Sequence, residues 1–153
     1  NYTSLILIGY NKLSVDRNEQ GVWSMEKMSK TNYKGFRDLI VYQKSYKFGL
    51  EIFQLTKTFP REELYSLTDQ IRKSSRSVPS NIAEAWYKRR YVKSFVAKLI
   101  DSSGEAAETE VWLDYSLDLK YIEKGKHDEL VDQYEEVLKM LNSMIQNPDK
   151  FCF

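Results

Sequence analysis

Cations that could contact a polyanion are concentrated between residues 72 and 93. They are Arg72, Lys73, Arg76, Lys88, Arg89, Arg90 and Lys93. Trp86, Tyr87 and Tyr91 are interleaved with the last of these cations, and a mixture of cations and aromatic rings suits phosphate contact together with base stacking. The pattern predicts a nucleic-acid site. The alternative is that the cations balance acidic residues of later helices, within or between subunits.

The net charge of +1 hides a polarity along the sequence. Residues 60–90 carry a net charge of +3, whereas residues 91–122 and 123–153 each carry −3. Such a distribution favours either helices that attract one another or a face that attracts a polyanion.

Residue types needed for catalysis or metal binding are scarce. His127 is the only histidine, and it lies in a polar stretch at the expected start of a helix. A di-iron bundle needs paired Glu-x-x-His motifs, and the zinc, phosphate-loop and serine-elbow spacings are missing from the sequence. Glu105 and Glu108 are spaced as an acid pair, although such a pair is more often a solvated face or a partner for nearby cations. The sequence predicts no enzymatic activity and no cofactor.

A structural motif of small and polar residues runs from Ser77 to Glu84. The small side chains would let a neighbouring helix come close. Pro79 removes a backbone donor, so a helix that runs through it must kink or restart. Ser80 is suited to cap the restarted helix.

Gly104 lies in the middle of a second small-residue stretch, residues 102–107. Glycine inside a helix costs about 1 kcal/mol relative to alanine, so we expect the two helix backbones to approach closely there. Polar residues near this crossing would form a buried hydrogen-bond network, because a buried polar group needs partners. The candidates are Gln70, Asn81, Glu84, Glu105 and Glu108; the alternative is that they are ordinary surface residues.

Hydrophobic periodicity predicts an all-α fold, an antiparallel up-down-up-down four-helix bundle. The expected helices span residues 36–58, 60–88, 91–122 and 126–146. The first helix carries two apolar stripes, one that includes Tyr46 and Leu50 and one that includes Phe48 and Ile52. The third helix carries a second stripe over residues 112–122. The additional stripes indicate self-association.

The bundle domain is expected to span residues 33–148, followed by a C-terminal tail at 149–153. Residues 1–32 have scattered charge and no sustained period, which predicts a disordered or non-native tail; the alternative is a docking arm around residues 5–8. The longest apolar run near the start is too short for a membrane span or a signal-peptide core. The single cysteine, Cys152, allows no intrachain disulfide. These features predict a cytoplasmic protein that does not enter a membrane.

Three segments resemble the four-helix-bundle proteins encoded in intervening sequences of bacterial 23S ribosomal RNA genes. They are GFRDLIVYQKS (35–45), FPREELYSLTDQIRKSSRSVPSNIAEA (59–85) and SSGEAAETE (102–110), and SVPSNIAEA is the most specific part. The likeness covers residues 33–145. The family usually has glycine where this chain has Ala85, so we expect the end of the second helix to be less bent.

The resemblance implies a bundle that assembles into a ring-like homopentamer. The chain is also similar to accessory proteins of diversity-generating retroelements, which share the pentameric barrel and use basic surface to bind nucleic acid and a reverse transcriptase. The sequence does not distinguish between an intervening-sequence protein and a retroelement accessory protein.

Two classes of function follow. The first is a non-enzymatic, oligomeric protein that binds RNA or DNA through its basic surface. The second is a protein-interaction scaffold, or an accessory subunit of a partner such as a reverse transcriptase, with no nucleic-acid site of its own. In that second class the exposed aromatic side chains of Trp86, Trp112 and Tyr115 would dock the partner.

Overall fold

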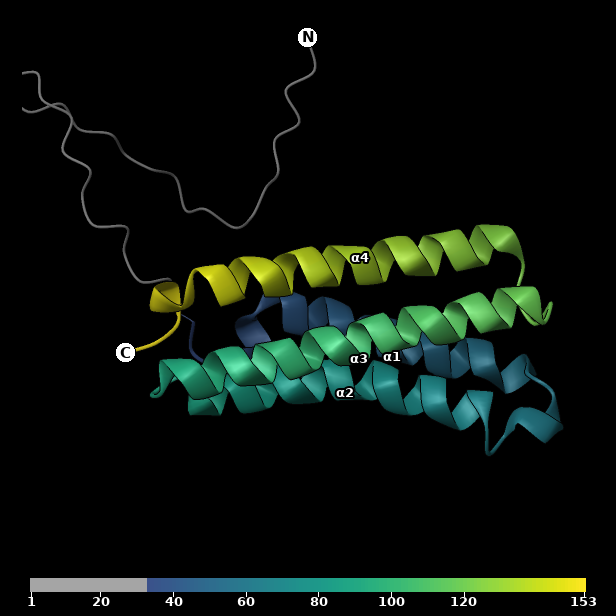
Figure 1. Ribbon diagram of the computed structural model, residues 1–153, viewed down its shortest axis with the longest axis horizontal. Coiled ribbons are helices and arrows are strands. Elements are labelled where there is room, and N and C mark those ends of the chain that lie inside the picture. Colours follow the sequence, from purple (N-terminus) through teal and green to yellow (C-terminus); the bar gives the residue numbers. More distant parts are fainter. Residues whose placement is uncertain (1–32) are drawn as a thin grey trace, which may run out of the picture.

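The computed structural model describes residues 33–153 as an all-α fold of four long helices, with no strand in that range. The helices are α1 (Ile40–Leu55), α2 (Leu67–Lys88), α3 (Val92–Asp118) and α4 (Lys124–Gln146). They lie side by side along the long axis of the molecule (Figure 1). The expectation of an all-α fold with four helices is confirmed. The tail or docking arm predicted for residues 1–32 lies outside the described residues.

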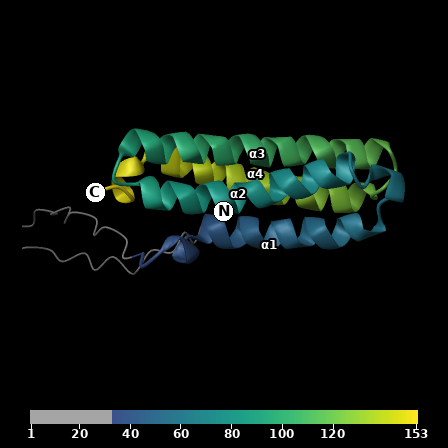
Figure 2. The same cartoon turned by 90° about the horizontal axis from the view of Figure 1, so that it is seen from below.

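Short connections join the helices at the ends of the molecule. Residues 89–91 connect α2 to α3, and residues 119–123 connect α3 to α4 at the opposite end (Figures 1 and 2). Two short 3-10 helices, η2 (Thr56–Thr58) and η3 (Arg61–Glu63), lie between α1 and α2. No helix in the described part of the chain is long and apolar enough to span a membrane.

Only one of the two apolar stripes of α1 is buried in the bundle. Phe48 and Ile52 belong to the core, whereas Tyr46 and Leu50 remain 53% and 52% exposed. The predicted helix 36–58 is also divided, because the backbone of Leu39 is extended and separates η1 (Phe36–Asp38) from α1.

The predicted second helix continues through Pro79 and does not restart there. Pro79 lies buried inside one continuous α2, so Ser80 is an interior helical residue and does not cap a second helix. Proline has no N–H to donate to the carbonyl of Ser75, four residues earlier. That carbonyl faces α1 at Gly49, where an added Cβ would lie 3.4 Å from the Ser75 oxygen. A close contact between α1 and α2 therefore accompanies the proline.

The start of α2 differs from the prediction by a few residues. Pro60 precedes η3, and α2 begins only at Leu67. The Glu63 carboxylate accepts hydrogen bonds from the Ser66 hydroxyl, from the Leu67 backbone N–H at 3.2 Å and from the Tyr121 hydroxyl at 3.0 Å. The Ser66 bond, followed by the other two, lowers the pKa of Glu63. This carboxylate thus ties the start of α2 to the connection between α3 and α4.

The boundary between α3 and α4 also differs from the prediction, which placed these helices at residues 91–122 and 126–146. The α3 helix ends at Asp118, and Lys120 adopts a left-handed backbone conformation with φ 63°. The N–H of Tyr121 then donates to the carbonyl of Ser116 at 2.8 Å, as in a helix C-terminal cap. Gly125 lies in the first turn of α4.

The most extensive helix pair is α2 with α3, and small polar side chains lie buried between them. Ser74 Oγ and Thr109 Oγ1 are hydrogen-bonded at 2.9 Å, and the Ser102 hydroxyl donates to the carbonyl of Val78 at 2.9 Å. The predicted small-residue crossing is therefore present. Gly104 takes no part in it, since this residue is exposed and an added Cβ would meet nothing within 4 Å.

The core extends over the whole bundle and includes the end of the chain. Its largest fully buried side chains include Tyr134 and Phe95. Phe151 stacks on Phe95 with ring centroids 5.9 Å apart, and Cys152 is a buried free thiol. Residues of the predicted 149–153 tail thus pack against the bundle.

Candidate nucleic-acid interface

The outer face of α2 carries three of the predicted cations in one groove. Arg72, Lys73 and Arg76 lie within about one turn of each other, so helical geometry puts them on the same side of α2. Lys73 and Arg76 are exposed and Arg72 is half-buried. The groove has a volume of about 480 Å³ and is lined by Asp69, Arg72, Lys73, Arg76, Ser77 and Ser80.

One aromatic ring of α1 lies beneath these cations. The guanidinium carbons of Arg72 and Arg76 are 4.8 and 5.5 Å from the centroid of the Phe53 ring. The ammonium nitrogen of Lys57 is 5.0 Å from the same centroid. We refer to Phe53, Lys57, Arg72, Lys73 and Arg76 as the Phe53 cluster.

Thr56 sets the orientation of Arg72 within the cluster. Arg72 Nε donates to Thr56 Oγ1 at 2.7 Å, and the Thr56 hydroxyl donates to the carbonyl of Ile52 at 2.9 Å. Thr56 is buried, so the anchor is shielded from water. The Nη atoms of Arg72 have no hydrogen-bond partner within residues 33–153.

No cation of the Phe53 cluster forms an ion pair within the described residues. A ring quadrupole attracts cations without neutralising their charge. Asp69 is the one acid that lines the groove, so the cluster retains a positive field toward solvent.

The remaining predicted cations lie at the turn between α2 and α3. We refer to Lys88, Arg89, Arg90 and Lys93 as the turn cluster. Arg90 and Lys93 are exposed, and neither forms an ion pair within residues 33–153. Lys88 is 3.7 Å from Glu84. Arg76 and Arg89 are separated by about 20 Å of helix, so the sequence set is divided between two surfaces.

The side chains of Arg89 and Trp86 pack against the rest of the protein. The prediction that both face solvent is therefore wrong. Trp86 is only 6% exposed and belongs to the core, which removes it as a base-stacking residue or a docking residue. The Arg89 guanidinium carbon lies 3.9 Å from the centroid of the Trp86 ring, and Arg89 Nη1 donates to the Trp86 carbonyl at 2.8 Å. Tyr87 and Tyr91 are the exposed aromatic residues of this region.

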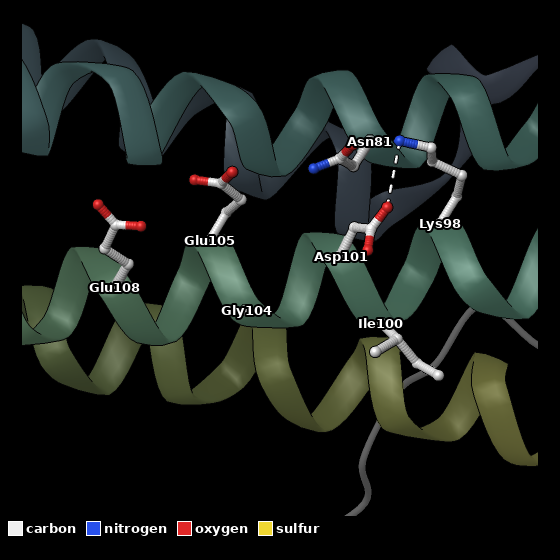
Figure 3. Close-up of a pocket in the computed structure, with 7 residues that line it drawn as sticks. All are labelled: Asn81, Lys98, Ile100, Asp101, Gly104, Glu105 and Glu108. Carbon is white, nitrogen blue, oxygen red and sulfur yellow. Dashed lines mark hydrogen bonds and ion pairs between the residues drawn. The ribbon is translucent and has the colours of Figure 1, made fainter.

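The predicted polar network is a surface arrangement around Lys98. Lys98 Nζ lies 3.2 Å from Asp101 and 3.3 Å from Asn81 Oδ1 (Figure 3). The same atom lies 3.1 Å from Glu84. Glu84 is exposed, so the buried-network hypothesis is wrong for this residue. The buried hydrogen bonds between α2 and α3 are made by serine and threonine.

An acidic groove lies between α2 and α3, beside the Phe53 cluster. It has a volume of about 530 Å³ and is lined by Asn81, Lys98, Ile100, Asp101, Gly104, Glu105 and Glu108 (Figure 3). Burial and the neighbouring Glu108 charge raise the pKa of Glu105, while Lys73 lowers it. Glu108 accepts a hydrogen bond from Trp112 Nε1 at 3.1 Å. Neither glutamate pairs with the arginines of residues 72–76 within the described chain.

His127 bridges two helices between two carboxylates. Its Nε2 lies 2.8 Å from Asp114 Oδ1 and its Nδ1 lies 3.0 Å from Asp128 Oδ1. The hydrogen bond with Asp128 raises the pKa of His127, burial opposes the shift, and the Asp114 contact raises the pKa further. Residues 33–153 contain no group of three or more ligands that could hold a metal ion.

Sequence reasoning missed Phe53, Thr56 and Lys57. Phe53 and Lys57 are four residues apart, a spacing that places both side chains on one face of a helix. That spacing was available from the sequence. The pairing of this face with the residue 72–76 face of α2 was not, because it depends on how the two helices pack.

The comparisons with known proteins agree with the fold. The family model described as 23S rRNA-intervening sequence protein matches residues 37–143. The chain is also similar to a crystal structure from Bacteroides thetaiotaomicron, described as a protein with unknown function from the S23 ribosomal protein family. The identity is 30%, the TM-score is 0.64, and the match covers 70% of this chain and 96% of that chain. No curated protein matches the chain. The chain belongs to the 23S rRNA-intervening sequence protein family.

Proposed function

We propose that this protein is a non-enzymatic, oligomeric antiparallel up-down-up-down bundle that binds RNA or DNA through its basic surface. The observation that carries the proposal is the set of cations on and beyond the outer face of α2 that lack acidic partners within residues 33–153. They are Lys57, Arg72, Lys73, Arg76, Arg90 and Lys93.

Unpaired surface cations favour a polyanionic ligand. Each phosphate that a cation neutralises releases a condensed counterion, which supplies most of the sequence-independent binding free energy. Exposed Tyr87 and Tyr91 lie beside Arg90 and provide rings on which unpaired bases can stack. The proposal thus assigns phosphate contact to both clusters and base stacking to the turn between α2 and α3.

Apolar side chains left exposed on α1 and α3 support an oligomer. On α1 they are Tyr46 and Leu50; on α3 they are Ile100, Val111 and Tyr115, and Leu119 directly follows α3. Burial of such side chains is worth about 25 cal/mol for each Å² removed from water. The family resemblance implies a homopentamer, in which each basic cluster would be repeated around a ring.

A second candidate function is a protein-interaction scaffold. It is favoured by the aromatic pair on α3, where Trp112 and Tyr115 have ring centroids 5.7 Å apart and Tyr115 is 52% exposed. A partner such as a reverse transcriptase would bury this pair. The two candidates differ in whether the isolated protein binds nucleic acid.

The test is an electrophoretic mobility shift with a structured RNA at low salt. The wild type is compared with a variant in which Arg72, Lys73, Arg76, Arg90 and Lys93 are all replaced by glutamine. We expect a shifted band with the wild type and none with the variant at the same protein concentration. No shift with the wild type would overturn the proposal in favour of the scaffold. Equal shifts with both proteins would overturn the assignment of RNA binding to these cations.

A further inference from the structure

We propose that the Phe53 cluster is a preorganised site for the phosphodiester backbone of a nucleic acid, in which Phe53 and Thr56 position Arg72 and Arg76. This inference rests on the proposed function and extends it. It identifies the surface that contacts the phosphates and states that this contact does not depend on base sequence. It also identifies Phe53 and Thr56 as the residues that position the arginines.

The first argument is the convergence of charge on one ring. Lys57, Arg72 and Arg76 come from separate turns of two elements, and all three approach the Phe53 centroid within 5.5 Å. Like charges held together repel one another, and an anion between them relieves this repulsion. Asp69 is the single acidic lining residue of the groove. A phosphate group supplies the missing negative charge.

The second argument is the geometry of Arg72. A guanidinium group has five N–H donors in a planar fork. Thr56 Oγ1 takes the Nε donor at 2.7 Å, which holds the plane of the group in place. The Nη donors are left for a ligand, and paired Nη donors match two oxygens of one phosphate. Thr56 therefore acts as a positioning residue.

The third argument is that the cluster does not recognise base sequence. The Phe53 ring is already in contact with three cations and is half-buried, so it offers no free face on which a base can stack. Apart from the carboxylate of Asp69, the other lining groups are hydroxyls of Ser77 and Ser80 and the ammonium of Lys73. These groups suit phosphate oxygens and carry no information about base identity. The cluster is therefore expected to bind unrelated sequences equally well.

The composition of the groove favours nucleic acid over a second copy of the chain. The acidic groove of another subunit would also match the charge. However, the centre of a protein–protein interface is typically depleted of charged residues, and the lining of this groove is charged or hydroxyl-bearing throughout. The experiment below treats a second copy as a separate outcome.

The test measures fluorescence anisotropy of two unrelated single-stranded RNAs of about 16 nucleotides over a salt series. Arg72→Gln/Arg76→Gln removes two phosphate contacts, so the slope of log affinity against log salt should become shallower by about 1.4. The matched control is Lys124→Gln/Lys139→Gln on α4, which also removes two positive charges and should leave the slope unchanged. Both RNAs should give the same results.

The positioning role is tested at Phe53 and Thr56. Phe53→Leu and Thr56→Val keep every charge, so the salt slope should stay near that of the wild type while affinity falls about three- to tenfold. Phe53→Tyr restores the ring face and should restore affinity. A purely structural role for Phe53 predicts equal affinity for the leucine and tyrosine variants whenever both remain folded by circular dichroism.

The possible failures are distinguishable. If the wild type binds RNA and only Arg90→Gln/Lys93→Gln makes the slope shallower, the inference fails and the proposed function stands. If the wild type binds neither RNA nor DNA at low salt, both fail. A decrease in molar mass of the Arg72→Gln/Arg76→Gln variant without nucleic acid would assign the groove to a subunit interface and also overturn the inference.

Discussion

Arg89 and Arg90 illustrate how neighbours determine the role of a residue. Both belong to the same basic dipeptide, yet Arg89 lies against Trp86 and within 4.9 Å of the Phe153 ring centroid, while Arg90 faces solvent. Removing Arg89 would disturb packing as well as charge. Arg90 is therefore the better position at which to test electrostatic binding.

A pH-dependent contribution to stability is expected from His127. Its folded-state pKa is raised above 6.5 by Asp128 and Asp114, so its contribution is fully present below pH 6.5 and is lost as the pH rises through the folded pKa. Relative to His127→Gln, we expect the wild type to have a larger free energy of unfolding at low pH, by about 0.5 kcal/mol, the scale of a surface pair.

The His127 prediction is checked by urea unfolding of both proteins across the neutral pH range. The difference between them should shrink as the pH rises. A difference that grows with pH would contradict the account. Asp114→Asn serves as a control, because removal of this partner should weaken the pH dependence of His127 without removing the imidazole.

At the residue scale, the sequence predicted which side chains carry charge but not which of them are available. The density of Lys and Arg in residues 72–93 is visible in the chain. The burial of Trp86 and the position of Phe53 beneath Arg72 depend on tertiary contacts. The cations of α2 could thus be anticipated, whereas Phe53 and Thr56, which position Arg72, could not.

At the scale of elements, the α2–α3 pair depends on buried hydroxyl groups. Thr109→Val would leave the Ser74 hydroxyl without this partner in an apolar environment, and the free energy of unfolding should fall by about 1–3 kcal/mol. In Ser74→Ala/Thr109→Val neither polar group remains. The double variant should therefore be less destabilised than the sum of the two single variants, as measured by chemical denaturation. Strictly additive effects would mean that the two hydroxyls do not interact.

Lys120, two residues after the end of α3, is a position at which a substitution should increase the stability of the protein. Lys120 has φ 63°, which is unfavourable for a side chain with Cβ and suits glycine. Lys120→Gly should raise the free energy of unfolding by about 0.5–1 kcal/mol. Thermal unfolding provides the measurement, and Ala107→Gly provides the control, because glycine at this exposed interior position of α3 should destabilise the protein by about 1 kcal/mol. A destabilised Lys120→Gly would contradict the assigned backbone conformation.

Helix number and type could be predicted from periodicity, whereas local breaks could not. Pro79 was expected to kink or restart the second helix, and α2 runs through it without a restart, with the Ser75 carbonyl close to Gly49. The third helix was expected to extend to residue 122, but α3 ends at Asp118 and the chain turns at Lys120, a residue type that does not favour a positive φ. Gly104 was expected at the helix crossing and is exposed. The type of residue alone therefore does not locate these features, because the same residue is tolerated inside a helix, in its first turn or on its exposed face.

At the scale of the whole molecule, charge is segregated into neighbouring grooves. The Phe53 cluster lies beside the acidic groove of Asp101, Glu105 and Glu108, with α2 shared between the two. Because the basic and acidic side chains are gathered in different grooves, a net charge of +1 is compatible with attraction of a polyanion.

The most direct measurement of the central claim is the salt dependence of RNA affinity for the unmodified protein. If Arg72, Lys73, Arg76, Arg90 and Lys93 each meet a phosphate, log affinity should fall against log salt with a slope of about −3.5 on single strands. Affinity should then drop roughly a hundredfold between about 50 and 200 mM salt. A slope near zero, or no binding at the lowest salt, would contradict the account of α2 as a nucleic-acid-binding face.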